Sequence, residues 1–354
     1  MKKSMKLPVF LILVCSMATL FSCQNPMSME TIVHEDGALD KTIVFEKGDS
    51  SLVDRNVFGI NSQRNWSASV TRLPEDNKEN NYRAQYRIVL TKHFNNAADM
   101  NAELGTSNDT LFGIKSSFEK KFRWFYTYIR YTETYSPIDR FKMISPSDYF
   151  NQEDFQFIER LPGEGKNIAK ADSVYLQVLN YKVSDVYGNM AIFKEEYTIL
   201  TELLKKNNME QQWFDTLFKK QDYIYDHVVD MRGDPLFAIK MIDSLNIPLP
   251  REKASADAEA LSRDFNRRLN FMGFARDGKY TNIIRMPWEV LDSNADSVSG
   301  NTVVWRPVVN KFLFTDYVMY AECRKLNFWA IYISGAFLIL TIIVWLWRSK
   351  PSVP

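Results

Sequence analysis

Residues 326–347 read LNFWAIYISGAFLILTIIVWLW, and this stretch decides where the rest of the chain must lie. Its 22 residues carry no charge. At about 1.5 Å per residue, a helix of this length spans roughly 33 Å, enough for a hydrocarbon core of about 30 Å. Aromatic side chains stand near both ends, and basic residues flank the run on each side: Arg324, Lys325, Arg348 and Lys350. A buried core helix is the alternative, but charges at both ends of so long a run favour a transmembrane helix.

The start of the chain has the pattern of a secretory signal. Residues 1–6 are basic, and the apolar run at 7–21 is short for a membrane span. The run closes with LFSC, ending at Cys23, and this ending resembles the lipobox of bacterial lipoproteins. The resemblance implies a signal peptide at 1–22 and acylation of Cys23, with palmitate or a similar chain. An uncleaved anchor helix with an incidental cysteine is the alternative.

Together the two ends predict a topology. The signal exports the chain and residues 326–347 stop its transfer, which leaves residues 348–354 as a short cytoplasmic tail. Because the basic residues on the two sides of the helix are balanced, the exported start decides the orientation. A helical span indicates the inner membrane, since outer-membrane spans are generally β-barrels. We therefore expect the lipid-anchored N-terminus and the ectodomain on the periplasmic side of a bacterial inner membrane.

Charge and cysteine content narrow the possible classes of protein. The net charge is +1, with 44 basic and 43 acidic residues, so no basic excess suggests a nucleic-acid partner. Of the three cysteines, only Cys323 remains a free thiol if Cys23 is acylated and the signal is removed. This excludes a disulfide framework. The sequence leaves open whether Cys323 pairs between chains, and it does not give the oligomeric state.

The exported chain changes its periodicity twice. Residues 23–145 have β-strand patterns, including an Asp-Gly turn signal at Gly37 and an aromatic stretch at 122–135, which we interpret as a central strand covered on both sides. Residues 146–278 have helical periodicity, and strand patterns return at 279–325. These patterns predict an α+β fold. Its antiparallel sheet combines the N- and C-terminal thirds around a helical insertion, and one transmembrane helix follows.

Two short motifs near the end carry a family resemblance. MPWEVL at 286–291 and SGNTVVW at 299–305 resemble a pattern of bacterial membrane lipoproteins with an LppM-like β domain followed by a C-terminal transmembrane helix. The resemblance covers residues 282–347, the lipobox and the Glu35-Asp36-Gly37 hairpin, and the long helical segment has no counterpart in it. It implies an envelope lipoprotein whose β domain contacts lipid or glycolipid, and it implies no enzyme.

A search for catalytic or metal-binding patterns assigns no residue. The three histidines fall in different predicted elements without metal-ligand spacing, so we assign no metal, cofactor-binding or catalytic residue. His227 and Asp230 lie one helical turn apart and are the best candidates for base catalysis. Two carboxylate pairs could bind a cation or act as acid and base, and a basic helix face could meet anionic headgroups, but we favour ordinary solvated positions for all of them: Glu195 with Glu196, Asp292 with Asp296, and Arg263 with Arg267 and Arg268.

These observations lead to one functional expectation with two alternatives. We expect a doubly anchored, non-enzymatic binding or assembly protein, whose partners are the membrane, an envelope lipid or a membrane protein. The first alternative is a periplasmic hydrolase of envelope lipid or glycan that uses His227. The second is a subunit of a membrane complex, in which Ser334, Gly335 and Thr341 form a helix contact face.

Overall fold

The computed structural model describes residues 25–48, 65–73, 86–106, 112–231, 234 and 236–348. The expected signal peptide, the expected lipid site at Cys23 and the tail residues 349–354 lie outside the described residues.

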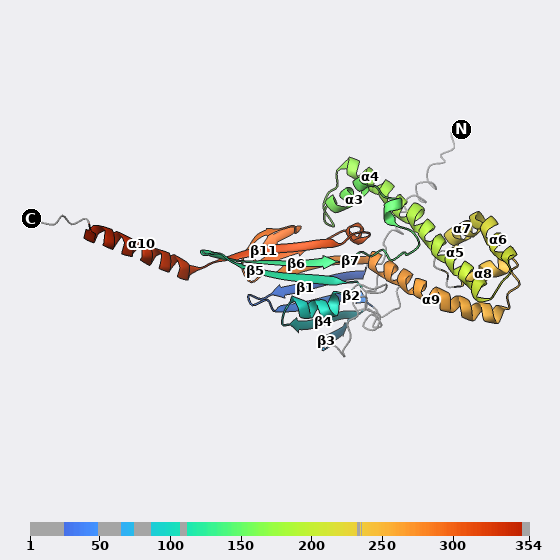
Figure 1. Ribbon diagram of the computed structural model, residues 1–354, viewed down its shortest axis with the longest axis horizontal. Coiled ribbons are helices and arrows are strands. Elements are labelled where there is room, and N and C mark those ends of the chain that lie inside the picture. The colour runs from blue at the N-terminus through green and yellow to red at the C-terminus, as the bar shows by residue number, and fades with distance from the viewer. Residues whose placement is uncertain are drawn as a thin grey trace, which may run out of the picture.

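Two β-sheets packed against each other form the centre of the molecule (Figure 1). The larger sheet has the order β3-β4-β2-β1-β7-β10-β9 and the smaller has the order β5-β6-β11-β8. The strands are β1 Asn25–Val33, β2 Leu39–Gly48, β3 Ser67–Arg72, β4 Tyr86–Phe94, β5 Ile114–Phe122, β6 Tyr126–Tyr135, β7 Gly278–Arg285, β8 Val290–Ser293, β9 Ser297–Ser299, β10 Thr302–Trp305 and β11 Tyr317–Leu326.

Each sheet joins strands from both ends of the chain, which confirms the predicted α+β class. In the larger sheet β1 pairs with β7, and in the smaller sheet β6 pairs with β11. The expectation of one antiparallel sheet needs refinement in two respects. There are two sheets, and β1 runs parallel to β7, with Met27 opposite Tyr280. A parallel pair requires a long crossover connection, and here residues 34–277 provide it.

The aromatic stretch at 122–135 is not one strand: it contains the last residue of β5, a turn and all of β6. The chain turns between β5 and β6, where Arg123 and Tyr126 exchange backbone hydrogen bonds of 2.7 and 3.2 Å. Strand β6 is central in its sheet, as predicted. Its residues alternate between buried and partly exposed, so only one face is fully covered.

A buried ionic network ties the two sheets together. Lys41 of β2 and Glu133 of β6 are each only 1% exposed, and the Lys41 Nζ lies 2.8 and 2.9 Å from the two Glu133 carboxylate oxygens. Thr31 of β1 and the hydroxyls of Tyr131 and Tyr135 also donate to Glu133. Burial opposes the charged form of Glu133, but Lys41 and the hydroxyl donors outweigh it and lower the pKa of this carboxyl.

The helical part of the chain lies mainly beyond one end of the sandwich (Figure 1). The long helix α9 leads back from it into β7. A π-helical segment, η4, interrupts the helix between α4 and α5. The helices are α2 Ala97–Leu104 (between β4 and β5), α3 Gln152–Arg160, α4 Lys170–Tyr181, η4 Lys182–Tyr187, α5 Gly188–Lys206, α6 Gln211–Lys219, α7 Gln221–Asp230, α8 Phe237–Ser244 and α9 Arg251–Arg276, with short 3₁₀ turns at Pro146–Asp148 and Val309–Phe312.

The last helix, α10 (Phe328–Arg348), projects from the opposite end of the sandwich (Figure 1). Its mean hydropathy is 2.2, and only 6% of its most apolar window is buried against the rest of the protein. By length and composition α10 can therefore cross a membrane.

Candidate functional site

Among the residues that the structure describes, His227, the candidate base from the sequence, is not paired with a carboxylate. His227 lies on α7, where its Nδ1 is 2.8 Å from the Tyr223 carbonyl oxygen and its ring contacts the Tyr223 ring. Within the described part of the chain His227 makes no bond to a carboxylate, and the expected pairing with Asp230 is absent. The geometry therefore gives no support to the hydrolase alternative at His227.

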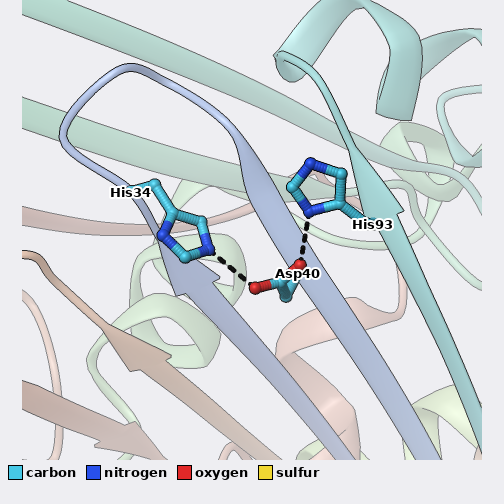
Figure 2. Close-up of side chains that lie close together, drawn as sticks. All are labelled: His34, Asp40 and His93. Carbon is cyan, nitrogen blue, oxygen red and sulfur yellow. Dashed lines mark hydrogen bonds and ion pairs between the residues drawn. The ribbon is translucent and has the colours of Figure 1, made fainter.

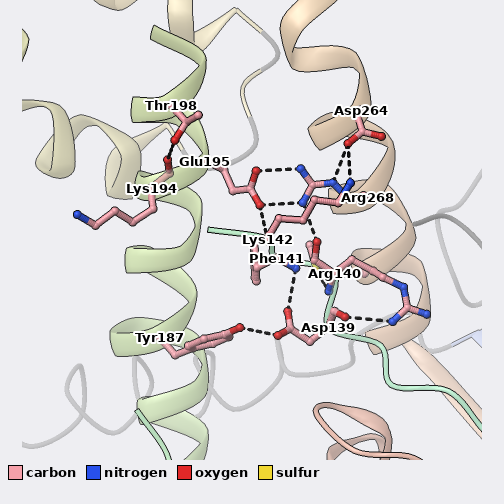
Figure 3. A network of polar contacts seen from close by, with 11 residues as sticks. Asp139, Arg140, Phe141, Lys142, Tyr187, Lys194, Glu195, Thr198, Asp264 and Arg268 are labelled. Atoms are coloured by element: carbon pink, nitrogen blue, oxygen red, sulfur yellow. Dashed lines mark hydrogen bonds and ion pairs between the residues drawn. The ribbon is translucent and has the colours of Figure 1, made fainter. Parts of the chain in front are cut away.

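The expectation that Glu195 and Glu196 are solvated is wrong, because both side chains are buried. Figure 3 shows the Glu195 carboxylate on α5 facing the Arg268 guanidinium on α9, with two N–O distances of 2.8 Å. Arg268, expected on an exposed basic face, is 3% exposed and faces α5 instead. Helical periodicity alone does not show which charged residue faces a neighbouring helix.

The Glu195–Arg268 pair also bonds to the backbone of residues 140–142, where the chain leaves the sandwich after β6. Arg268 donates to the carbonyl oxygen of Arg140 at 2.6 Å, and the backbone N–H of Lys142 donates to Glu195 at 2.7 Å (Figure 3). Burial opposes the charge on Arg268, but the bonds to Glu195 and Asp264 outweigh it and raise the pKa of the guanidinium. The pair thus forms a joint, a polar contact that connects α5, α9 and the chain that follows β6.

Glu196 has a different environment from its neighbour. Burial, and next repulsion from Glu195 and Asp234, raise the pKa of Glu196 to about 8. Its carboxyl makes no hydrogen bond to another described residue. Glu196 is therefore a titratable group inside the helical part rather than a partner of Glu195 in acid–base chemistry.

A mostly apolar pocket of about 350 Å³ opens beside this joint. It lies between η4, α9 and the chain that follows β6, and its lining includes Asp139, Tyr187, Ile192, Leu269, Gly273 and Leu313. The Tyr187 hydroxyl donates to Asp139 at 2.5 Å (Figure 3), while burial raises the pKa of Asp139. π-Helical segments often accompany functional sites, so this pocket is a candidate for an apolar ligand.

The second predicted carboxylate pair, Asp292 and Asp296, is also separated. Asp296 bonds to Lys166 at 3.0 Å and accepts the backbone N–H of Arg306 at 2.7 Å, whereas Asp292 accepts from the Tyr320 hydroxyl at 3.3 Å. The two aspartates therefore have different structural partners, on segments outside their own turn.

The junction between the sandwich and α10 is tightly built. Asn327 is the single residue between β11 and α10, and it is buried. Its backbone N–H donates to the Phe125 carbonyl oxygen at 2.8 Å, its Nδ2 donates to Arg123 O at 2.9 Å, and its Oδ1 accepts from the Thr127 hydroxyl at 2.9 Å. The turn of the β5–β6 hairpin is thereby fixed against the first turn of α10.

Aromatic side chains extend this junction along the helix. The Phe122 and Trp329 rings are stacked, with centroids 5.9 Å apart, and the Trp124 Nε1–H donates to the Ser334 hydroxyl at 2.9 Å. Ser334 thus contacts the hairpin of its own chain, while Thr341 donates to the Phe337 carbonyl within α10. One of the three polar positions expected to meet a partner helix is therefore already occupied within the protomer.

Cys323 lies on β11 with its side chain in the core. It is fully buried, and burial raises the pKa of its thiol to about 11. A disulfide between folded chains would require this strand to open.

The structure brings together two histidines that the sequence left in separate elements. Figure 2 shows Asp40 of β2 between His34, which follows β1, and His93 of β4. Each imidazole has one nitrogen 2.6 Å from a different oxygen of Asp40.

Comparisons with known proteins assign no family. No protein-family model matches the chain, and no curated protein matches it. Among solved structures it is similar to the folded domain of the Mycobacterium tuberculosis LppM protein, determined by NMR. The sequence identity is 8% and the TM-score 0.24, over 86% of this chain and 91% of that one. This is a weak resemblance of fold.

Proposed function

We propose that this chain is a membrane-anchored, non-enzymatic assembly protein that holds its helical part at a fixed height above a bilayer. In this proposal α10 spans the membrane, and the sandwich stands on the membrane surface as a rigid support. The helical part binds a protein partner at the membrane-distal end. The observation that carries the proposal is the junction at Asn327.

The junction supports the proposal because it removes the freedom that a linker would give. A flexible tether of several glycine or serine residues would let the ectodomain take many orientations. Here the strand and the apolar helix are separated by one buried residue whose side chain and backbone are bound by the hairpin turn. The orientation of α10 therefore sets the orientation of the sandwich.

The hairpin turn has the composition of a membrane interface. Phe122, Trp124 and Phe125 are exposed there although they are large and apolar. Basic side chains lie at the end of β5, on the turn and at the end of β11: Lys120, Lys121, Arg123, Arg324 and Lys325. Aromatic rings settle at the headgroup level of bilayers, and basic side chains are attracted to anionic headgroups.

The partner surface that we propose lies on α4, in the helical part. Val174, Val178 and Tyr181 follow the spacing i, i+4, i+7, and all three are exposed. A row of apolar side chains on one helix face is a surface that a partner protein can cover. We assign the protein-binding role to this face.

Photo-cross-linking in native membranes tests both parts of the proposal. A benzophenone amino acid replaces Phe125 on the hairpin turn, Val178 on α4, or Glu259 on the polar, exposed face of α9 as the matched control. We expect lipid adducts at Phe125 and one discrete protein adduct at Val178, neither of which forms at Glu259. A Val178→Asp variant should remove that partner from a mild-detergent purification. Absence of lipid adducts at Phe125 contradicts the seating on the membrane. A Val178 signal that does not exceed that of Glu259 contradicts the assembly role.

The apolar pocket favours a second candidate function, the binding of a lipid or another apolar small molecule. A side chain added at Gly273 meets no atom within 4 Å at its Cβ, so a larger residue is accommodated at the pocket lining. Gly273→Leu should fill the pocket and reduce lipid retained by the purified protein in native mass spectrometry, whereas Gly273→Ala should retain it. Equal lipid retention by the two variants would exclude this pocket as the binding site.

A further inference from the structure

Strand register places His34, Asp40 and His93 on one outer surface of the larger sheet. Asp40 stands opposite Ile32 on one side and His93 on the other. Leu39 and Lys41 point into the core, so the alternation of β2 turns Asp40 outward. His34 follows β1 directly, at the start of the hairpin turn, and reaches the same carboxylate (Figure 2).

The three side chains have the donor atoms of an open metal site. One ligand atom from each residue lies within 4.8 Å of the other two. Zinc bonds to histidine nitrogen and carboxylate oxygen at about 2.0–2.2 Å, so tetrahedral ligand atoms stand about 3.3 Å apart. The His–Asp pairs, now at 2.6 Å, would have to widen by several tenths of an ångström to admit an ion. The side chains are 43%, 39% and 58% exposed, which leaves room for that adjustment.

The charges around the carboxylate also suit a cation. Within the described part of the chain, Asp40 has no lysine or arginine partner, because Lys41 points inward to Glu133. A divalent ion would complement the Asp40 carboxylate, and imidazole nitrogens are common ligands of such ions.

Solvent has access to the cluster. A surface hollow of about 460 Å³ lies beside Asp40 and His93, with Asn65, Ser67 and Thr91 among its other lining residues. A metal held by three protein ligands keeps a position for water or a small ligand, and this hollow provides the space for it.

We propose that His34, Asp40 and His93 form a binding site for one divalent transition-metal ion of the zinc type. None of the three residues belongs to α10, to α4 or to the lining of the apolar pocket, so the site is separate from the function proposed above. The competing explanation is a metal-free cluster in which Asp40 bridges two histidines by hydrogen bonds.

Calorimetric titration of the full-length protein in detergent distinguishes the two explanations. The protein is first treated with a chelator and then titrated with Zn²⁺ alone. We expect one saturable site whose affinity falls at least tenfold in His34→Ala, His93→Ala and Asp40→Asn. The matched control is His227→Ala, because His227 is the only other histidine in the chain, and its affinity should equal that of the unaltered protein.

Two further measurements keep the test independent of folding defects. Zn²⁺ should raise the melting temperature of the unaltered protein and of His227→Ala, but not that of His93→Gln. X-ray absorption of the zinc-loaded protein should show two imidazole nitrogens at about 2.0 Å. Absence of saturable binding overturns the proposal. Binding that persists unchanged in a His34→Ala, His93→Ala double variant also overturns it.

Discussion

The buried pair Lys41–Glu133 gives the sharpest test of how the two sheets are held together. Lys41→Met removes the cation that bonds to both Glu133 oxygens, and it keeps a side chain of similar length. Glu133→Gln removes the charge but keeps an oxygen that can accept from Tyr131, Tyr135 or Thr31. Breaking a buried ion pair from one side costs about 3–5 kcal/mol, because the remaining charge stays buried without its partner.

The double variant Lys41→Met, Glu133→Gln distinguishes the interaction energy of the pair from the cost of each single substitution. Replacement of both charges by uncharged groups of similar volume is often nearly neutral. We therefore expect each single variant to lose about 3–5 kcal/mol and the double variant to lose less than either, giving a coupling energy of about 3 kcal/mol or more. Urea unfolding of the full chain in detergent, followed by tryptophan fluorescence, measures this because Trp305 is buried in the same core.

The pH dependence of the variants provides an internal check. In the unaltered protein the pKa of Glu133 is lowered, so its contribution to stability is present above the unfolded-state pKa and is lost as the pH falls through the folded-state value. In Lys41→Met burial is no longer opposed by a cation, the pKa of Glu133 should rise, and stability should fall as the pH increases. Single variants that each lose less than about 1 kcal/mol, or losses that simply add, would refute this account of the network.

Three further predictions concern other buried groups. The pKa of Glu196 is about 8 in the folded protein and about 4.5 in an unfolded chain, so this carboxyl destabilises the folded protein as the pH rises above 4.5. Glu196→Gln should therefore stabilise the protein by about 3 kcal/mol at pH 7 and have no effect near pH 4, and unfolding at both pH values measures this. Arg268→Leu should cost about 3–5 kcal/mol by leaving Glu195 buried and unpaired, and hydrogen exchange at residues 139–142 should rise, whereas Arg267→Leu should change neither. Cys323 should resist maleimide at pH 8 in the folded protein and react after urea unfolding, since it is buried and its thiol pKa is about 11; mass spectrometry counts the adducts.

The parts of the fold that depend on local pattern could be predicted from the sequence. The apolar run that forms α10 and the helical periodicity of α9 are properties of single segments. The turn at Arg123 was missed because aromatic residues surround it and neither glycine nor proline marks it. The parallel β1–β7 pair was missed because it joins segments about 250 residues apart, and no local pattern determines their relative direction.

The side-chain clusters depend on pairings between distant segments. Asp40 meets His93 across 53 positions, and Glu195 meets Arg268 across 73. A partial signal was present for the first cluster, because Asp40 closely follows the predicted Asp-Gly turn at Gly37. The register of β2 against β4 was still needed to bring them together. For Glu195 and Arg268 the helix faces were ambiguous until the contact of α5 with α9 was known.

The direction of β1 bears on the expectation of two anchors. Its far end leads into the hairpin turn, where Glu35 bonds to Lys325 beside α10, so its first residue, Asn25, lies at the opposite end of the sandwich. A nine-residue strand extends about 27–30 Å, and Cys23 is joined to Asn25 by at most about 8 Å of chain. If α10 spans a bilayer and the sandwich stands upright on it, Asn25 lies at the membrane-distal end, and the two residues of chain to Cys23 are too short to span the length of β1. Lipid adducts at Val178 on α4 would indicate an inclined sandwich instead. Their confinement to Phe125 would indicate an upright sandwich with Asn25 at its membrane-distal end.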